Sequence, residues 1–229
     1  MQAEIMVLKI PQNITSNDYR QLLSLVSEEK RLKISRLRQQ CDVYRTLFGE
    51  VLVRAAIVRN LDLSNQAIQF TSNSYGKPSL IGCEDFHFNI SHAGEWAALF
   101  ISSSPVGIDV EQIGEIDESI AKSYFSKMEY ERLFCLRGEE RTAYFYELWT
   151  LKESYIKAKG KGLSIPLDSF SIHISEDSFI ALTPRTEAYF FKQYELNRSY
   201  KLAACTTAPK GFPNQLQHWS MEDLIHLFF

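Results

Sequence analysis

Two acidic side chains near the middle of the chain lie two positions apart, close enough to act together. In the segment 106–111, VGIDVE, the two-residue period of a β-strand places the apolar residues on one face and Asp109 and Glu111 on the other. Carboxylates this close repel each other unless a cation neutralises them, and Mg²⁺ prefers oxygen ligands of this kind. Alternating apolar and acidic residues are also common on strands with one face in water. The pair therefore indicates either a metal site or an exposed strand face.

A second group of chemically active side chains falls in the segment 149–157, WTLKESYIK. Trp149, Glu153 and Lys157 recur at four-residue intervals, so a helix places them on one face. The alternative is a surface ion pair between Glu153 and Lys157, which contributes only about 0.3–0.5 kcal/mol. The spacing alone leaves both interpretations open.

Two short segments that precede these clusters have the residue types of a phosphate site. The segment 88–92, FNISH, ends a predicted strand with Ser91 and His92, which can donate hydrogen bonds to a phosphate. His92 could equally be a structural residue at the end of the strand. The segment 74–78, SYGKP, is a predicted turn, in which the glycine lets a ligand approach the backbone and the proline restricts the lysine to extended conformations. A plain surface turn explains the same residues.

The elements that must position these residues are long helices and short strands. Ser27 and Asp42 are predicted to cap two helices in the first half, and Ser126 with Glu129 has the spacing of a capping box in the second. Gly160 ends the long helix that carries the second cluster. Strand-like runs occupy residues 86–90, 96–101, 106–110, 170–174, 179–182, 189–196 and 200–207.

This order of elements predicts an α+β fold. We expect two similar, tightly packed subdomains related by a pseudo-twofold axis, each a long helix against a small, largely antiparallel sheet. The predicted N-terminal subdomain covers residues 1–104, and the C-terminal subdomain covers residues 105–229 and includes the C-terminal tail. The halves share no residue-level repeat, and no low-complexity linker joins them, which favours intimate packing.

Length and composition argue against several other classes of protein. The chain has 229 residues, 45% of them hydrophobic and 23% charged, and its net charge of −3 indicates neither a nucleic-acid partner nor an electrostatic membrane anchor. No run approaches the roughly 20 apolar residues of a membrane span, and the first residues do not have the pattern of a signal peptide. The four cysteines are too scattered for a zinc site or a disulfide scaffold, so we expect a cytoplasmic protein with reduced thiols.

Three segments, FNISHAGEW, VGIDVE and WTLKESYIKAKGKGL, occur in this order and closely resemble the signature segments of the surfactin-type, or Sfp-group, 4'-phosphopantetheinyl transferases. The resemblance extends through SEEKRLKISRL, YRTLFGEVLVR, SYGKP, YFSKMEY and LSIPLDSFS, and so covers the chain from about Ser27 to Ser171. Eight segments in register are not credible as a chance match. The match is weakest after about Phe212, and we assign no chemistry to that tail.

The resemblance implies an enzyme that transfers the 4'-phosphopantetheine group of coenzyme A to a serine of an apo acyl or peptidyl carrier protein and releases adenosine 3',5'-bisphosphate. The family's metal ligands fall on Asp109, Glu111 and Glu153, which would hold Mg²⁺ or, in its place, Mn²⁺. The family's coenzyme A contacts fall on Lys30, Lys33, Arg45, Thr46, Tyr75, Gly76, Lys77, Pro78, Ser91, His92, Asp109, Lys152 and Lys157. Lys152 and Lys157 correspond to lysines that face the diphosphate.

The resemblance also implies catalytic roles for Glu129, Lys152, Glu153 and Lys157. Glu129 aligns with a carboxylate proposed to accept the serine proton, but the capping box explains the same residue, so both roles are open. Two rival functions are a metal-dependent phosphohydrolase that would release free phosphopantetheine, and a binding module without turnover. We expect a monomer that binds neither nucleic acid nor a membrane.

Overall fold

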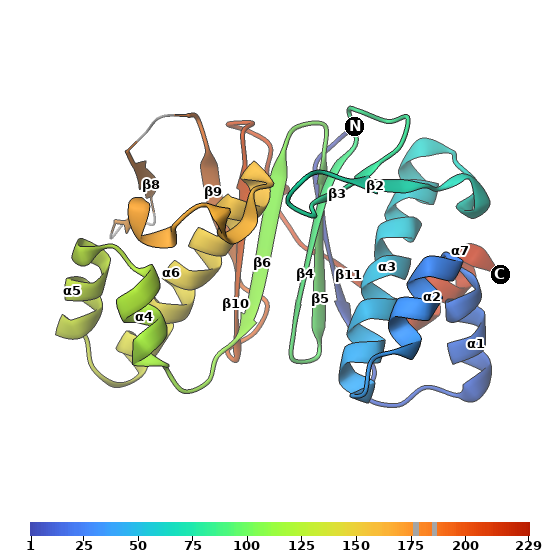
Figure 1. The fold of residues 1–229 in the computed structure, drawn as a ribbon, viewed down its shortest axis with the longest axis horizontal. Coiled ribbons are helices and arrows are strands. Elements are labelled where there is room, and N and C mark those ends of the chain that lie inside the picture. Colours follow the sequence, from blue (N-terminus) through green and yellow to red (C-terminus); the bar gives the residue numbers. More distant parts are fainter. Residues whose placement is uncertain (176–178, 185–186) are drawn as a thin grey trace.

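The structure, a computed structural model, describes residues 1–175, 179–184 and 187–229, which form two α+β halves side by side (Figure 1). The helices are α1 (Ser16–Ser24), α2 (Glu28–Ser35), α3 (Gln40–Leu61), α4 (Glu118–Tyr124), α5 (Lys127–Cys135), α6 (Gly138–Lys159) and α7 (Met221–Phe228). The strands are β1 (Glu4–Lys9), β2 (Phe70–Ser72), β3 (Pro78–Leu80), β4 (His87–Ala93), β5 (Trp96–Ser102), β6 (Val106–Gln112), β7 (Ser171–Ile174), β8 (Ile180–Thr183), β9 (Phe190–Tyr194), β10 (Tyr200–Thr206) and β11 (Gln217–Trp219). Each half contains one 22-residue helix, α3 or α6, so the predicted fold class is confirmed.

The first half is built on a four-stranded sheet with the strand order β11-β1-β5-β4. β1 pairs antiparallel with β5, and β5 with β4, whereas β11 joins β1 in parallel. α3 packs on this sheet because Leu47, Val51 and Ala55 recur at every fourth position and are fully buried. α1, α2 and α7 pack against α3 in turn.

The second half is built on a three-stranded antiparallel sheet with the order β6-β10-β9. α6 lies across β6 and β10, and its predicted apolar stripe of Tyr144, Leu148, Leu151 and Tyr155 is buried there. α5 and the hairpin of β7 and β8 pack beside α6. The helix is therefore held on both sides, and its remaining face is free to carry polar residues.

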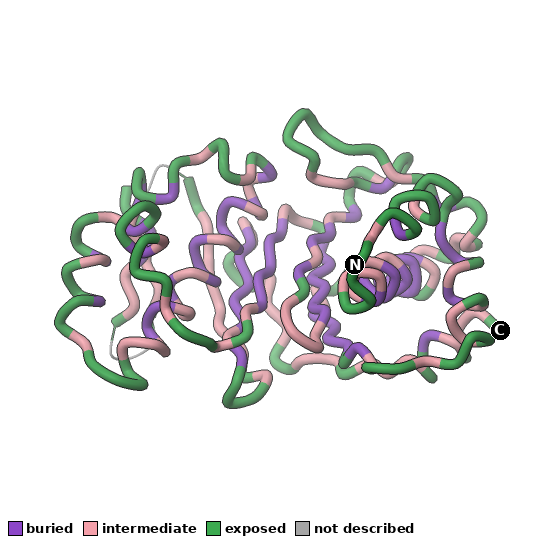
Figure 2. The backbone as a smooth tube through the Cα atoms, turned by 60° about the horizontal axis from the view of Figure 1, so that its bottom comes forward, coloured by how far each residue is buried: buried purple, intermediate pink, exposed green. Residues whose placement is uncertain are grey.

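The two sheets meet at β4 and β6, which run side by side in the middle of the molecule (Figure 1). Burial is concentrated in these central strands and the helices that cover them (Figure 2). Side chains bridge the two strands: Asn89 Oδ1 accepts a hydrogen bond from Ile108 N at 2.8 Å. On the other side of β6, a Cβ at Gly107 would lie 1.9 Å from the carbonyl oxygen of Ser154. Only glycine lets α6 approach the strand this closely.

The predicted helix ends lie close to the observed ones. Ser27 Oγ accepts a hydrogen bond from the backbone of α2 as its N-cap, and the capping box of Ser126 and Glu129 opens α5. Gly160 follows α6 in the left-handed conformation, with φ of +68°. The start of α3 differs, because the helix begins at Gln40 and Asp42 lies inside its first turn. In that position the carboxylate still interacts favourably with the positive end of the helix dipole.

The C-terminal tail, predicted to belong with the second half, lies against the first. β11 pairs with β1, and α7 packs on α3 with Leu224 fully buried. Residues 217–229 therefore complete the first sheet and its helical layer, although they come last in the sequence. Periodicity could indicate the helix but not which half it packs against.

Both long helices carry charged residues along their length, because one face of each meets polar groups or solvent. In the described ranges of the chain, no helix has both the length and the apolar character required to cross a membrane.

Candidate active site

Three acidic residues and one lysine meet where β6 faces α6. Asp109 and Glu111 come from the strand, and Glu153 and Lys157 come from the helix. Asp109 is only 2% exposed, and its Oδ1 accepts hydrogen bonds from Lys157 Nζ at 2.5 Å and from Ser91 Oγ at 2.9 Å. Lys157 Nζ also donates to Ser91 Oγ at 3.1 Å. One ammonium group therefore joins β4, β6 and α6.

Burial makes all three acids of this cluster harder to ionise, and the charge of Asp109 adds repulsion at the other two. Burial raises the pKa of Asp109, against the opposing effect of Lys157 and Ser91. Burial and repulsion by Asp109 raise the pKa of Glu153, and the same causes raise the pKa of Glu111 to about 7. Burial disfavours the charge of Lys157, but the three carboxylates outweigh it, so the pKa of Lys157 is raised. The cluster has more acidic groups than its one lysine can neutralise.

The donor atoms of this cluster fit a hard metal ion. The described part of the chain has no three His, Cys, Asp or Glu side chains already gathered around one point. However, Asp109 Oδ2 is buried and finds no hydrogen-bond partner among the described residues. A buried acceptor left in this way costs about 1–3 kcal/mol, and more when it is charged. With Glu111 and Glu153 beside it, this oxygen belongs to a donor set of the kind that binds Mg²⁺.

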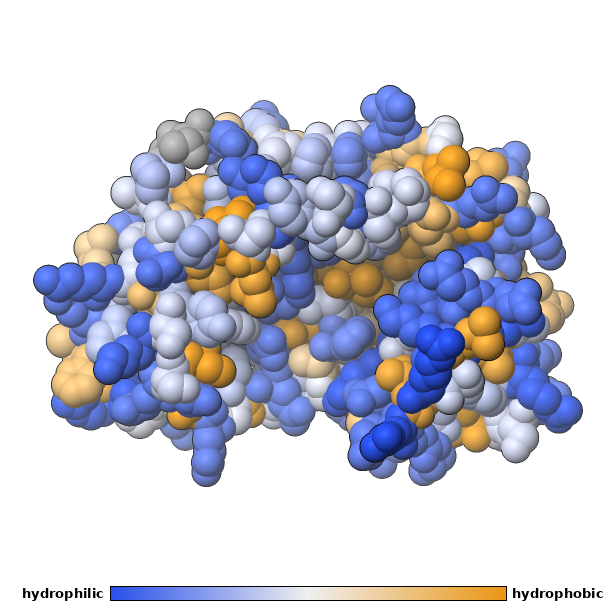
Figure 3. Space-filling view, in the orientation of Figure 1, coloured by the Kyte–Doolittle hydropathy of each residue, from blue (hydrophilic) through white to orange (hydrophobic). Residues whose placement is uncertain are grey.

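A cavity of about 850 Å³ lies in the first half, between α2, α3 and the hairpin of β2 and β3. Figure 3 shows it as a hollow between the polar surface of α2 and this hairpin, with apolar atoms at its base. Its apolar lining comes from Val53, Phe70, Ile81, Phe88 and Ile90. Its basic lining comes from Lys30, Lys33, Arg45, Arg54 and His92. An apolar base with several cations suits a ligand that combines a flat ring with phosphate groups.

The cavity collects most of the residues that the sequence resemblance assigned to coenzyme A. These are Lys30, Lys33, Arg45, Thr46, Gly76, Pro78 and His92. Ser91 lies instead in the acidic cluster, and Tyr75 is 54% exposed on the turn beside the cavity. Apart from Tyr75, Lys77 and Lys152, the predicted residues therefore fall into two neighbouring groups. The charge of Lys157 in one group helps to lower the pKa of His92 in the other.

The positive charge of the cavity is organised by one acid that sequence reasoning missed. Glu50 accepts from Lys30 Nζ and from Arg54 Nε, each at 3.0 Å. The four-residue spacing of Glu50 and Arg54 on α3 could have indicated this pair. Desolvation and the neighbouring Arg45 lower the pKa of His92, which keeps its imidazole neutral at pH 7.

Lys77 does not direct its ammonium into the cavity. Its Nζ donates to three backbone carbonyl oxygens, at 2.9 Å from Val106, 2.7 Å from Lys157 and 3.2 Å from Ala158. Burial lowers the pKa of Lys77 to about 8, with Cys205 opposing the effect. At pH 7 the side chain is therefore still mainly an ammonium, with one N–H for each carbonyl.

Glu129 and Lys152 form a buried pair away from the acidic cluster. Lys152 Nζ lies 2.8 Å from Glu129 Oε2 and also donates to the carbonyls of Leu167 and Phe170, at 2.7 and 2.8 Å. Glu129 accepts in addition from the backbone N–H groups of Ser126 and Ile172. The exposed fractions of the two side chains are only 2% and 0%. The bond with Ser126 is the one that the capping alternative requires. A proton acceptor for an incoming serine would have to break several of these contacts.

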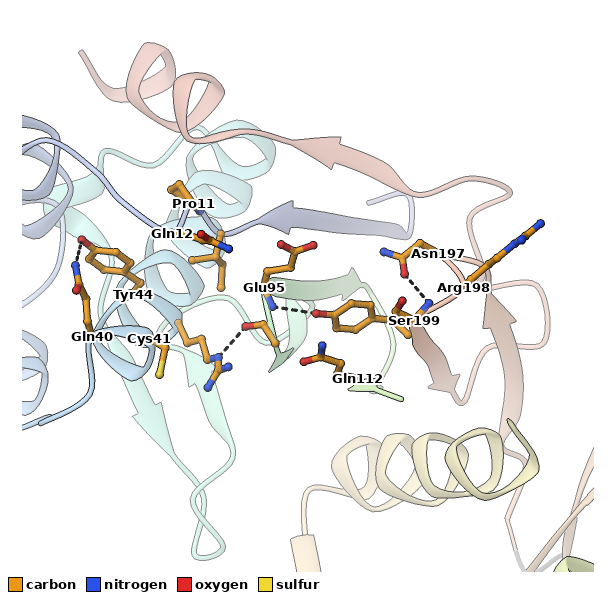
Figure 4. A pocket seen from close by; sticks show the side chains of 14 residues that line it. Pro11, Gln12, Gln40, Cys41, Tyr44, Glu95, Gln112, Asn197, Arg198 and Ser199 are labelled. Carbon is orange, nitrogen blue, oxygen red and sulfur yellow. Dashed lines mark hydrogen bonds between the residues drawn. The ribbon is translucent and has the colours of Figure 1, made fainter. Parts of the chain in front are cut away.

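A second cavity, of about 910 Å³, opens at the other side of Arg45 (Figure 4). Arg45 Nε donates to the carbonyl of Gly94 at 3.0 Å, and Tyr200 Oη accepts from Glu95 N at 3.1 Å. Gln112 projects toward the space between these groups (Figure 4). Except for Arg45, its lining was not anticipated, because it comes from the first turns of α3 and from loops and strand ends of both halves.

Comparisons with known proteins connect this geometry to a family. The family described as "4'-phosphopantetheinyl transferase, N-terminal" matches residues 13–104, and the "4'-phosphopantetheinyl transferase superfamily" matches residues 105–205. The 4'-phosphopantetheinyl transferase Sfp of Bacillus subtilis is 41% identical over 214 residues, which cover 93% of this chain and 95% of Sfp. The 4'-phosphopantetheinyl transferase gsp of Aneurinibacillus migulanus is 38% identical over a stretch that covers 98% of this chain and 94% of the gsp chain. Because these matches span both halves and the seam where the acidic cluster lies, the chain belongs to the Sfp-like 4'-phosphopantetheinyl transferases and is an enzyme of that family.

Proposed function

We propose that this enzyme moves the 4'-phosphopantetheine group of coenzyme A onto a serine of an apo acyl or peptidyl carrier protein, with Mg²⁺ or Mn²⁺ as the metal and adenosine 3',5'-bisphosphate as the second product. The observation that carries the proposal is the buried, unpartnered Oδ2 of Asp109 in an acidic cluster next to a cavity with basic walls. Coenzyme A has the matching groups: an adenine, a 3'-phosphate and a diphosphate.

The cavity in the first half binds the nucleotide end in this proposal. Lys30, Lys33 and His92 contact the 3'-phosphate, and the apolar residues at the base contact the adenine, with the turn of Gly76 and Pro78 beside it. These groups do not react. Their binding energy fixes the diphosphate in position over β6, which lowers the entropy cost of the transfer.

The acidic cluster handles the reacting groups. Asp109, Glu111 and Glu153 hold the metal, which when bound offsets the charge of the diphosphate. The serine oxygen forms a new bond to the β-phosphorus while the bond from that phosphorus to the bridging oxygen breaks. Lys157, already positioned by Asp109 and Ser91, stabilises the charge that develops on the leaving phosphate. The serine proton passes to a carboxylate of this cluster, directly or through water.

We assign Glu129 and Lys152 a positioning role instead of direct contact with substrate. Their mutual pairing, and their bonds to the start of α5, to β7 and to the segment after α6, support this assignment. Removing one partner would leave the other charged and buried, so the pair holds α5 and α6 in a fixed relation.

We also propose that the enzyme acts on a carrier protein, is a monomer and is located in the cytoplasm. The four cysteines are free thiols, which suits a reducing compartment. The seam between the halves is where a carrier serine would meet the acidic cluster and Lys157.

The test is intact-mass analysis of apo carrier proteins incubated with the enzyme, coenzyme A and Mg²⁺, with and without EDTA. The expected result is one phosphopantetheine per carrier on a serine, an equal amount of adenosine 3',5'-bisphosphate, and no reaction in EDTA. Free phosphopantetheine with several unmodified carriers would establish the phosphohydrolase instead, and binding of coenzyme A without any product would establish a binding module.

A further inference from the structure

The ammonium of Lys77 lies at the point where the two elements of the acidic cluster come together. It binds the carbonyl of Val106, the first residue of β6, and those of Lys157 and Ala158 in the last turn of α6. Asp109 follows on the same strand, and Lys157 Nζ contacts Asp109 from the same helix. The main chain of Lys157 is therefore held by Lys77, while its side chain is held by Asp109.

The turn that carries Lys77 acts as a cap supplied to α6 by the other half of the molecule. The last carbonyls of a helix have no partner within it, and a cation there is favoured by the helix dipole. Lys77 satisfies two of these carbonyls, and Asn73 Nδ2 donates to the carbonyl of Gly160 at 2.7 Å. Asn73 Oδ1 accepts from the backbone N–H of Tyr75 and of Lys77, each at 2.9 Å, which fixes the turn itself.

The opposite side of the same turn lines the nucleotide cavity, through Gly76 and Pro78. One seven-residue segment, from Ser72 to Pro78, thus has the cavity on one side and the end of α6 on the other. All three N–H groups of Lys77 Nζ already have a carbonyl acceptor, so a phosphate could bind this ammonium only by displacing at least one of them.

We propose that Lys77 is a positioning residue, not a phosphate ligand: it sets the register of α6 against β6 and so places Lys157 for the reaction. The inference rests on the proposed function for its kinetic consequence. Loss of the Lys77 ammonium lets the last turn of α6 shift, and Lys157 then no longer meets the developing charge. The expected effect is on kcat and not on the affinity for coenzyme A.

The test compares variants with coenzyme A and with dephospho-coenzyme A. Lys77→Met keeps the length of the side chain and removes all three donors, and we expect kcat to fall about 10- to 100-fold with KM for both ligands nearly unchanged. Lys77→Arg restores a charged donor and should recover part of kcat. Lys33→Met, on the cavity wall, should instead raise KM for coenzyme A.

Two further variants separate positioning from general loss of stability. Asn73→Asp keeps the acceptor that fixes the turn but removes the donor to Gly160, so it should lower kcat in the same manner. Lys192→Met removes a lysine bond to a carbonyl elsewhere, that of Pro213 at 2.9 Å, and should leave kcat unchanged. Far-ultraviolet circular dichroism confirms that each variant is folded at the assay temperature.

Hydrogen–deuterium exchange gives a readout that does not require turnover. Lys77→Met should speed exchange in peptides that cover β6 and the end of α6, but not in β1 or β5. A rise in KM for coenzyme A greater than for dephospho-coenzyme A, with unchanged kcat and exchange, would show that Lys77 binds phosphate and would overturn the inference. If the wild-type enzyme modified no carrier, the proposed function would fail, while the exchange result would still decide whether Lys77 holds α6 against β6.

Discussion

The acidic cluster should make the metal-free protein less stable as the pH rises, and Glu111→Gln should remove part of this loss. The folded-state pKa of Glu111 is raised from 4.5 to about 7 by burial and by repulsion from Asp109 and Glu153. When folding raises the pKa of an acid, the stability associated with its protonated form is fully present at pH values below the pKa that the group has in the unfolded chain. That stability is lost as the pH rises from about 4.5 through 7, because the unfolded chain then gives up its proton more readily.

The size of the effect follows from this difference of about 2.5 pKa units. At about 1.36 kcal/mol per unit, ionised Glu111 costs at most about 3.4 kcal/mol of folding free energy at pH 8. Glu111 is partly exposed, and solvent and salt screen the repulsion, so we expect about 1–2 kcal/mol. For a chain of this size, that corresponds to a rise in Tm of roughly 2–8 °C. Glutamine keeps the shape of the side chain and its capacity to accept the hydrogen bond from Trp149.

The assay is thermal unfolding in EDTA at pH 5 and pH 8, followed by circular dichroism. Glu111→Gln should exceed the wild type in Tm at pH 8 and lose most of this advantage at pH 5, where the wild-type carboxyl is already protonated. Glu131→Gln is the matched control, since Glu131 is 64% exposed and its partner Lys127 is 3.9 Å away. Equal Tm shifts at the two pH values, or a lower Tm for Glu111→Gln at pH 8, would refute the electrostatic account of the cluster.

Four other outcomes follow from the contacts of the two sites. His92→Ala and Lys30→Ala should each raise KM for coenzyme A about 10- to 100-fold but leave dephospho-coenzyme A little affected, since a charge-assisted bond to phosphate contributes about 1.5–3 kcal/mol; steady-state kinetics with both ligands checks this. Lys157→Ala should lower kcat for both ligands alike in the same kinetics. The pKa of His92, followed by NMR, should rise when adenosine 3',5'-bisphosphate binds, because the anion offsets the desolvation that lowers it in the free protein. Glu129→Gln should lower the free energy of unfolding in urea by about 3–5 kcal/mol, because it leaves Lys152 buried without its counter-charge.

Local patterns in the sequence were sufficient to predict features that depend on a single helix, strand or turn. The stripe of Leu148 and Leu151, the cap at Ser27 and the turn at Gly160 depend on neighbours within a few positions, and the structure contains all of them. Strand alternation likewise placed Asp109 and Glu111 beside each other, and the charge of Asp109 helps to raise the pKa of Glu111.

Such patterns could not predict contacts between residues that are far apart in the sequence. Glu129 meets Lys152 through the packing of two helices. Lys77 donates to the backbone of Lys157 and Ala158, which come much later in the sequence. A lysine between a glycine and a proline can bind either a phosphate or the carbonyls at the end of a helix. Its residue type therefore cannot show which of these two partners it has. The base of the cavity was missed for a similar reason, because Val53, Phe70 and Phe88 come from three separate elements.

The place of β11 at the edge of the first sheet has a consequence for how the chain is made. Residues 217–219, which cover the outer edge of β1, come late in the sequence relative to β1 and so leave the ribosome well after it. Until then, the N–H and C=O groups on that edge of β1 have no strand beside them and can pair with other chains. The strands β6, β9 and β10 are separated by shorter stretches of sequence, so the second half can close first. We therefore expect the nascent protein to complete its later half before its earlier one, with β1 exposed to chaperones in the interval.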